Sequence, residues 1–141
     1  MNLFADIRAL VLSDIVAMSK ASIIPNGLAT NNVTVEPPRD AAHGDMSTNA
    51  AMVLAKPTGM KPREIAEALA ERLLKDPRII SAEVAGPGFL NLRLSPVVWQ
   101  GLIAAILGAG TAFGRSNIGQ GIKVNIEFVS ANPTGPLHVG H

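Results

Sequence analysis

Apolar residues recur at helical spacing in two long segments of the chain. In residues 2–21 they fall on one stripe, formed by Leu3, Ile7, Leu10, Val11, Ile15 and Met18. Such a stripe is typical of an amphipathic helix that buries one face. In residues 62–75 a second stripe includes Ile65, Leu69 and Leu73. Because a helix tolerates proline in its first turn, Pro62 marks the beginning of this second helix.

Two further helices are predicted from capping residues and apolar content. A helix over residues 47–56 is small and apolar, and either Asp45 or Ser47 is positioned to cap its first turn. Another helix begins after Ser95, a typical N-cap residue that is followed by proline. Its apolar residues are Trp99, Leu102, Ile103, Ile106 and Leu107. Their spacing predicts that Trp99 lies in the core.

Shorter runs alternate with the period of a strand. The β-branched run Val33–Glu36 is stopped by two prolines and is interpreted as a short strand. Residues 79–84 and 89–94 flank a Gly-Pro-Gly turn and form a predicted hairpin. In its second strand, one face carries Leu90, Leu92 and Leu94, and the other carries Phe89, Asn91 and Arg93. We therefore expect the leucine face to be buried and the other face to be exposed.

The order of these elements predicts an α+β fold, with a small antiparallel sheet covered by helices. Residues 1–112 form this domain, and residues 113–121 form a Gly-rich linker. Residues 122–129 follow as a strand that is apolar on both faces, like a strand in the middle of a parallel sheet. Residues 122–141 are therefore predicted to start a second domain.

Composition limits the class of protein. The 141 residues are 48% apolar and 16% charged, with a net charge of +1, so a packed core is expected and overall charge does not indicate a nucleic-acid ligand. The chain has no cysteine, which removes disulfides and cysteine-based zinc sites. Neither a secretory signal nor an apolar run of bilayer length is present. We expect a soluble, cytoplasmic protein with no membrane partner and no bound metal.

Two parts of the sequence resemble a known family. Residues 127–141, EFVSANPTGPLHVGH, lead from a strand-like run through a turn to His-Val-Gly-His. This string resembles the ATP-binding HIGH motif of class I aminoacyl-tRNA synthetases. Residues 43–52 (HGDMSTNAAM), 61–66 (KPREIA) and 83–91 (EVAGPGFLN) resemble the amino-terminal domain of arginyl-tRNA synthetases. The chain is thus identified as a member of that family, as an amino-terminal fragment that ends at the HIGH-type motif.

The resemblance implies an enzyme that forms arginyl-adenylate from L-arginine and ATP, with Mg²⁺, and transfers the arginyl group to tRNA(Arg). It implies that the amino-terminal domain binds the tRNA elbow at the D-loop. It also implies that residues 122–141 are the first strand and turn of a truncated, Rossmann-like catalytic domain. The lysine-rich KMSKS loop of that class has no counterpart in the chain. We therefore expect the fragment to be inactive alone. The full enzyme is expected to be a monomer.

His138 and His141 are the expected catalytic and ATP-binding residues. Imidazole N–H groups can stabilise the negative charge that develops on phosphate oxygens. Gly140 has no Cβ and lets the nucleotide approach closely. The alternative, half of a two-histidine metal site, lacks a further ligand nearby.

The resemblance assigns arginine binding to Glu127, Ser130 and Asn132. A carboxylate such as that of Glu127 can hold a guanidinium in a two-pronged fork. Without the resemblance, Glu127 is better explained as an exposed strand residue, and Asn132 as a turn residue.

Binding of tRNA is expected from Phe89, Asn91 and Arg93. An exposed aromatic ring can stack on a flipped-out base, while an amide reads the base edge and a guanidinium holds a phosphate. In the resembling family, an aromatic–x–amide pair contacts a protruding D-loop base. The alternative is that Phe89 belongs to the core, as most aromatic residues do.

Two other functions remain open. A free-standing RNA-binding module would bind tRNA without ATP, and its affinity would fall steeply with salt. A nucleotide-binding protein that uses residues 108–121 as a phosphate loop is disfavoured, because no GxxxxGK[ST] string is present. The apolar segment 122–129 predicts self-association of the fragment, or disorder beyond about residue 118.

Overall fold

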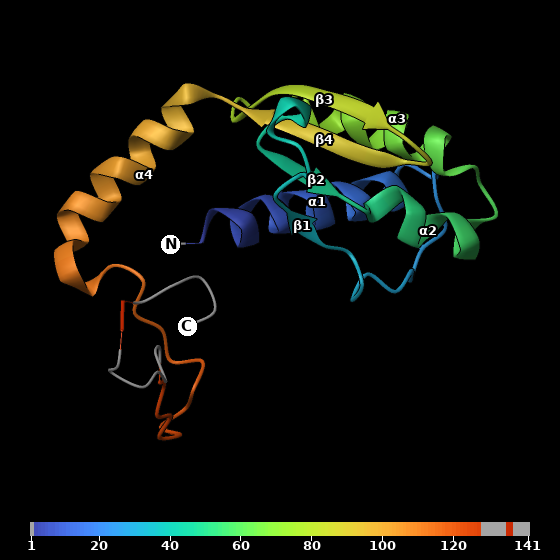
Figure 1. Cartoon of the computed structure of the whole chain (residues 1–141). Helices are drawn as coiled ribbons and strands as arrows, with labels where there is room; N and C mark the ends of the chain where they lie inside the picture. The colour runs from blue at the N-terminus through green and yellow to red at the C-terminus, as the bar shows by residue number, and fades with distance from the viewer. Residues whose placement is uncertain (1, 128–134, 137–141) are drawn as a thin grey trace. The chain divides into compact units, whose positions relative to one another are not determined.

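The computed structural model describes residues 2–127 and 135–136, and it divides into two compact units, Met1–Gly110 and Thr111–His141. The first unit contains the helices α1 (Leu3–Lys20), α2 (Ala50–Thr58), α3 (Pro62–Leu73) and α4 (Pro96–Ala109) (Figure 1). Its strands are β1 (Val35–Glu36), β2 (Met46–Thr48), β3 (Ile79–Ala85) and β4 (Phe89–Leu94). A 3₁₀ turn, η1 (Ala41–His43), lies between β1 and β2, and a second, η2 (Gly110–Ala112), follows α4.

The four strands form one antiparallel sheet in the order β1-β2-β4-β3. Strands β3 and β4 are the predicted hairpin, and the turn between them uses the positive φ of Gly86 and Gly88. Helices α1 and α3 lie along one face of the sheet, and α2 packs beside α3 (Figure 1). The α+β class with a small antiparallel sheet is therefore confirmed.

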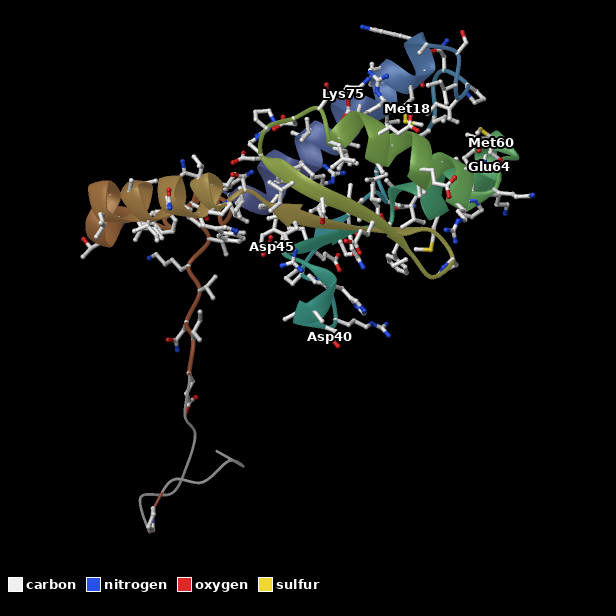
Figure 2. All side chains as sticks on the ribbon, turned by 90° about the horizontal axis from the view of Figure 1, so that it is seen from above. Met18, Asp40, Asp45, Met60, Glu64 and Lys75 are labelled. Atoms are coloured by element: carbon white, nitrogen blue, oxygen red, sulfur yellow. The ribbon has the colours of Figure 1, made fainter. Side chains whose placement is uncertain are left out.

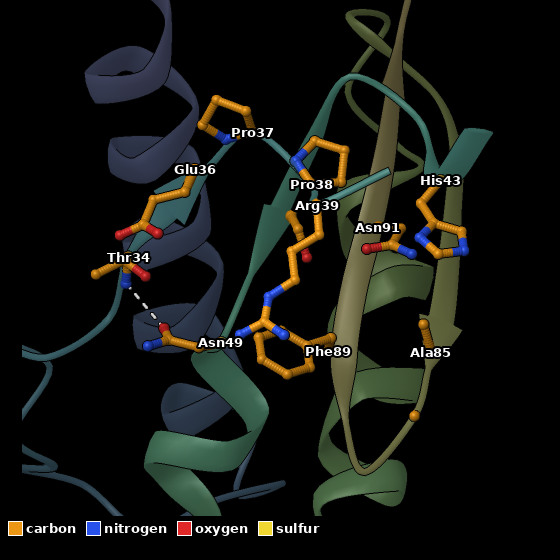
Figure 3. Close-up of a pocket in the computed structure, with 12 residues that line it drawn as sticks. Thr34, Glu36, Pro37, Pro38, Arg39, His43, Asn49, Ala85, Phe89 and Asn91 are labelled. Atoms are coloured by element: carbon orange, nitrogen blue, oxygen red, sulfur yellow. Dashed lines mark hydrogen bonds between the residues drawn. The ribbon is translucent and has the colours of Figure 1, made fainter. Parts of the chain in front are cut away.

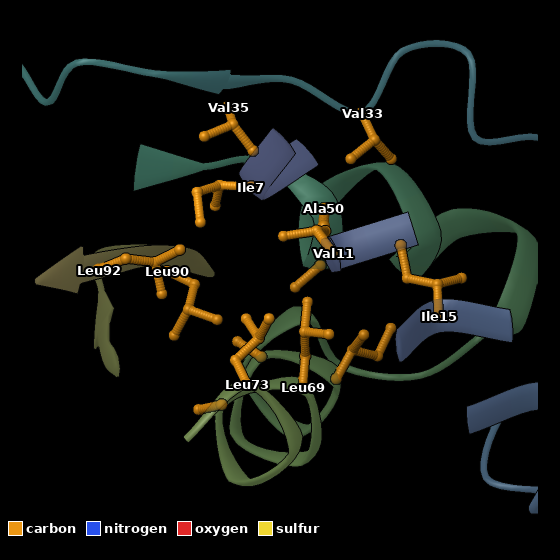
Figure 4. Packing of buried hydrophobic residues seen from close by; sticks show 14 of the residues in the cluster. Ile7, Val11, Ile15, Val33, Val35, Ala50, Leu69, Leu73, Leu90 and Leu92 are labelled. Atoms are coloured by element: carbon orange, nitrogen blue, oxygen red, sulfur yellow. The ribbon is translucent and has the colours of Figure 1, made fainter. Parts of the chain in front are cut away.

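The core lies between this face of the sheet and the helices (Figure 4). The buried side chains of the predicted stripes are Ile7, Val11, Ile15 and Met18 of α1, Ile65, Leu69 and Leu73 of α3, and Leu90, Leu92 and Leu94 of β4. Burial of a side chain of this size contributes roughly 1.5–3 kcal/mol relative to exposure. The three stripes therefore provide the main driving force that folds this unit.

The segment around β2 differs from the prediction. Residues Met46–Thr48 form a strand, and helix α2 begins only at Ala50. The prediction that Asp45 or Ser47 caps this helix is wrong, because Ser47 lies within the strand and Asp45 accepts a hydrogen bond from the backbone N–H of Leu94. Pairing with β4, which lies far away in the sequence, outweighs the local preference for a cap.

Helix α4 forms over the predicted residues but buries none of them. The prediction that Trp99 lies in the core is wrong, because its side chain is 36% exposed, and that of Leu107 is 77% exposed. Among the described residues of this helix, Val98 in the first turn is the one that packs against the core. Within the first unit, the described residues form no close packing of another element against the rest of the apolar stripe of α4, and helical spacing alone cannot reveal that.

The described part of the second unit contains no strand. Residues 122–127 are irregular, and Ile122, Val124 and Ile126 are exposed by 74%, 71% and 65%. The prediction of a strand is therefore wrong for these residues, because a strand needs a hydrogen-bonded neighbour and none pairs with them here. The rest of the predicted strand, residues 128–129, lies outside the described residues. No helix in the described chain is long and apolar enough to cross a membrane.

Candidate nucleic-acid interface

The face of the sheet that points away from the helices carries a polar row. The strand register pairs one residue of each strand with one residue of the neighbouring strand. Across the sheet, the paired residues are Glu36, Ser47, Asn91 and Glu83. Residues paired in antiparallel strands point to the same face of a sheet, so these side chains form a row across it. The adjacent row, which includes Val35, Thr48 and Leu90, is buried against the helices. One face thus holds the core and the other is available for a ligand.

Phe89 stands beside this polar row, opposite Ala85 and on the same face as Asn91. Its side chain is 40% exposed, so Phe89 is not a core residue. Leu90 and Leu92, which alternate with these residues, are buried. The strand therefore presents an aromatic ring to solvent on one face, while its buried leucines anchor the other face to the core.

A cavity of about 450 Å³ opens on this face, between the β3–β4 hairpin and the loop that follows β1 (Figure 3). Its walls include Glu36, Arg39, His43, Phe89 and Asn91. Cavities of roughly 300–1,000 Å³ hold small molecules in other proteins. The pocket is therefore large enough for a planar group such as a nucleobase.

Asn91 is the polar residue most enclosed by this pocket. It lines the cavity but is only 9% exposed, although it belongs to the outer face of the sheet. Figure 3 shows no hydrogen bond from its amide to the other lining residues that are drawn. The amide offers the pocket a carbonyl acceptor and two N–H donors. The side chain is thus set up to bind the edge of a polar ligand.

The loop 37–45 forms one wall of the pocket. Two prolines end β1, because proline has no N–H with which to continue the strand ladder. The Oδ1 atom of Asp40 then accepts a hydrogen bond from the N–H of Ala42 at 2.9 Å, which caps η1. This 3₁₀ turn carries His43 to the pocket (Figure 3).

Gly44 and Asp45 fix the far end of the same loop to β4. Gly44 has a φ of 110°, and a Cβ atom there would lie 2.7 Å from the carbonyl oxygen of Leu92, so only glycine allows this approach. The N–H of Asp45 donates to that same carbonyl at 2.8 Å. The Oδ2 atom of Asp45 accepts from the N–H of Leu94 at 2.7 Å. The wall is therefore held by hydrogen bonds to the backbone of β4 before any ligand arrives.

Asn49 holds the chain on the opposite side of the pocket. Its Oδ1 atom accepts from the N–H of Thr34 at 2.8 Å, and its Nδ2 atom donates to the carbonyl of Asn32 at 3.1 Å. The hydroxyl of Thr48 donates to the carbonyl of Thr34 at 2.7 Å. These bonds tie the segment before β1 to the end of β2.

The structure brings together two of the three residues predicted to bind tRNA. Phe89 and Asn91 line the pocket, whereas Arg93 is exposed on the same face, opposite Ser81, and is not a lining residue. The sequence analysis missed Arg39 and His43 as pocket residues. The pair of prolines after a very short strand is the signal that a rigid loop, rather than more sheet, follows β1.

Most residues predicted for adenylate formation lie beyond the described chain. Glu127 is described and is exposed. Ser130, Asn132, His138, Gly140 and His141 lie outside the described residues. Within residues 2–127 and 135–136, no cluster of histidine, aspartate and glutamate side chains is arranged to hold a metal ion.

The fold and the pocket define a small α+β binding domain, with helices on one face of a sheet and a polar pocket on the other. The family described as "Arginyl tRNA synthetase N terminal domain" matches residues 7–94, from α1 to the end of β4. This match includes both strands of the hairpin, α2, α3 and most of α1. The chain belongs to this family, as the resemblance predicts.

Curated relatives match beyond these residues as well. The arginine–tRNA ligase of Cereibacter sphaeroides is 70% identical over 141 residues, which is 100% of this chain and 24% of the relative. The arginine–tRNA ligases of Paracoccus denitrificans and Ruegeria pomeroyi are 67% and 64% identical, with the same coverage. The chain thus spans about a quarter of the length of the curated relatives that it matches.

Proposed function

We propose that this chain is part of an arginine–tRNA ligase, which joins L-arginine to tRNA(Arg) in the cytoplasm and converts ATP to AMP and pyrophosphate. The proposal is supported by relatives of that name that are 64–70% identical to the whole chain. This similarity also includes the segment after residue 94, where the match to the family domain ends. A free-standing RNA-binding module would not require that segment.

Within that enzyme, residues 1–112 bind the elbow of the tRNA at the D-loop. The observation that carries this proposal is the position of Asn91, a residue that is 9% exposed and that lines the pocket beside the exposed ring of Phe89. An unpaired base stacks on Phe89 and meets the amide with its edge. Arg93, on the same face but outside the pocket, holds a backbone phosphate.

Residues 122–141 contribute to the site where arginyl-adenylate forms, and residues 113–121 link them to the tRNA-binding domain. His138, Gly140 and His141 bind Mg²⁺-bound ATP, and Glu127, Ser130 and Asn132 bind arginine. The 141-residue chain alone is expected to show no arginine-dependent exchange of pyrophosphate into ATP. The complete enzyme is a monomer, whereas this chain self-associates through residues 122–129.

Binding of a tRNA(Arg) transcript tests the role of the pocket. The Phe89→Ala variant should bind about tenfold more weakly in a filter assay, because base–aromatic stacking contributes roughly 1–3 kcal/mol. Asn91→Ala should weaken binding by a similar factor, since it removes the amide that meets the base edge.

Lys75→Ala is the matched control, because Lys75 is an exposed cation just after α3 and does not line the pocket. It should leave the dissociation constant almost unchanged. Circular dichroism establishes that each variant is folded. Wild-type affinity in a folded Phe89→Ala variant would contradict the proposed site.

A further inference from the structure

The pocket is also lined by a guanidinium group. Arg39 lines the same cavity as Phe89 and extends from the loop after β1 (Figure 3). In that view its guanidinium is directed toward the ring of Phe89. Arg39 is exposed, and no described carboxylate lies within ion-pair distance of it. Its planar group is therefore available to a ligand.

The backbone of Arg39 is held in place although its side chain is exposed. Pro37 and Pro38 restrict the chain immediately before it. Asp40, directly after it, caps η1 through the N–H of Ala42 at 2.9 Å. The far end of the loop is bonded to β4 through Asp45. The loop thus fixes the point from which the guanidinium reaches across the pocket.

We propose that Arg39 is the second wall of the base-binding pocket, so that an unpaired base is held between its guanidinium and the ring of Phe89. The inference rests on the proposed function and adds a residue to it. Arginine planes stack on unpaired bases of RNA, and the base gains contact with a flat surface on both of its faces. Asn91 then contacts the edge of the enclosed base.

The charges around Arg39 favour a base over a phosphate. Glu36 lines the same cavity, and Glu83 belongs to the polar row next to it. A phosphate inside the pocket would face these carboxylates, and like charges placed together weaken binding. A neutral base avoids that repulsion. The single guanidinium is thus matched to a planar, uncharged group.

The test compares Arg39→Ala and Arg39→Lys with the unaltered 141-residue chain. Each protein is titrated with an unmodified tRNA(Arg) transcript and with transcripts in which one D-loop nucleotide at a time is abasic. Arg39→Ala should weaken binding of the intact transcript by about five- to tenfold. Arg39→Lys should recover less than half of this loss on a logarithmic scale, because lysine keeps the charge but has no plane to stack.

One abasic transcript should bind the wild type and Arg39→Ala equally, since the base that Arg39 covers is missing. On the intact transcript, the double variant Phe89→Ala with Arg39→Ala should lose affinity by a smaller factor than the product of the two single-variant factors. Lys75→Ala again controls for the loss of one positive charge.

The outcomes separate this inference from the proposed function. If Phe89→Ala weakens binding but Arg39→Ala does not, the second wall is wrong and the binding site stands. Full recovery by Arg39→Lys, or an equal Arg39→Ala loss on every abasic transcript, would show a charge contact instead and overturn the inference. If Phe89→Ala has no effect on any transcript, the proposed site itself is wrong.

Discussion

At the scale of single residues, two carboxylate–guanidinium pairs show how burial and geometry compete. The side chain of Arg78 donates two hydrogen bonds to Asp76, at 2.9 and 2.8 Å, and these bonds hold the pKa of Asp76 below its usual range. Arg72 approaches Asp14 only to 3.5 Å, and its buried Nε has no hydrogen-bond partner among the described residues. There, burial raises the pKa of Asp14 despite the nearby guanidinium.

The Asp76–Arg78 pair predicts the direction in which stability changes with pH. Figure 2 shows the described side chains of the chain. Because the pKa of Asp76 is lower in the folded protein than in the unfolded chain, its contribution to stability is present at neutral pH and is lost as the pH falls through the folded pKa. Asp76→Asn should lower the free energy of unfolding by about 1 kcal/mol at neutral pH. In urea titrations this difference should shrink below about pH 4.

Glu67→Gln is the control for this measurement. Glu67 pairs with Arg63 at 3.0 Å, but both side chains are more than half exposed, at 56% and 71%. Its loss should change stability little at either pH. A deficit of Asp76→Asn that stays constant down to about pH 3 would show that the charge of Asp76 is not the cause.

At the scale of elements, the sequence predicts those helices and strands whose apolar residues recur with a regular spacing. The stripes of α1 and α3 and the alternation in β4 give the core side of the fold and place Phe89 and Asn91 together on the open face. Strand β2 is missed because it has three residues and is formed by pairing with β4, which no local pattern reveals. Arg39 is missed for the same reason, since its place in the pocket depends on the closure of loop 37–45 onto β4.

The closure of that loop can be tested through Gly44. Gly44→Ala should lower the free energy of unfolding by roughly 2–3 kcal/mol, because the positive φ is strained and the new methyl group meets the carbonyl of Leu92 at 2.7 Å. Gly59→Ala is the matched control: Gly59 also has positive φ, 70°, but nothing lies within 4 Å of an added Cβ. It should cost only about 1 kcal/mol. Equal losses in thermal melts of the two variants would show that the close approach at Gly44 does not matter.

At the scale of the whole molecule, the stable core and the proposed RNA-binding pocket belong to the same unit. The buried core and every pocket residue belong to Met1–Gly110. In the described part of Thr111–His141, all residues are exposed. The unit that is proposed to bind RNA is thus expected to fold without the segment that is proposed to bind ATP and arginine.

Removal of Thr111–His141 tests this separation. A chain that ends at Gly110 should melt within a few degrees of the 141-residue chain, about 1 kcal/mol or less in stability. Its dissociation constant for the tRNA(Arg) transcript should agree within about twofold, roughly 0.4 kcal/mol. A tenfold loss of affinity would instead show that residues beyond Gly110 contact the RNA directly.

The alternation along β4 has a consequence for how this domain can change over time. Leu90 and Leu92 interleave with Phe89 and Asn91, so adding or deleting a single residue in this strand would turn the leucines toward solvent and the ring toward the helices. Folding and ligand contact would then be lost in one event. Exchanges of side chain on the outer face carry no such penalty, so new binding preferences are expected to arise by substitution, with the length of the strand kept constant.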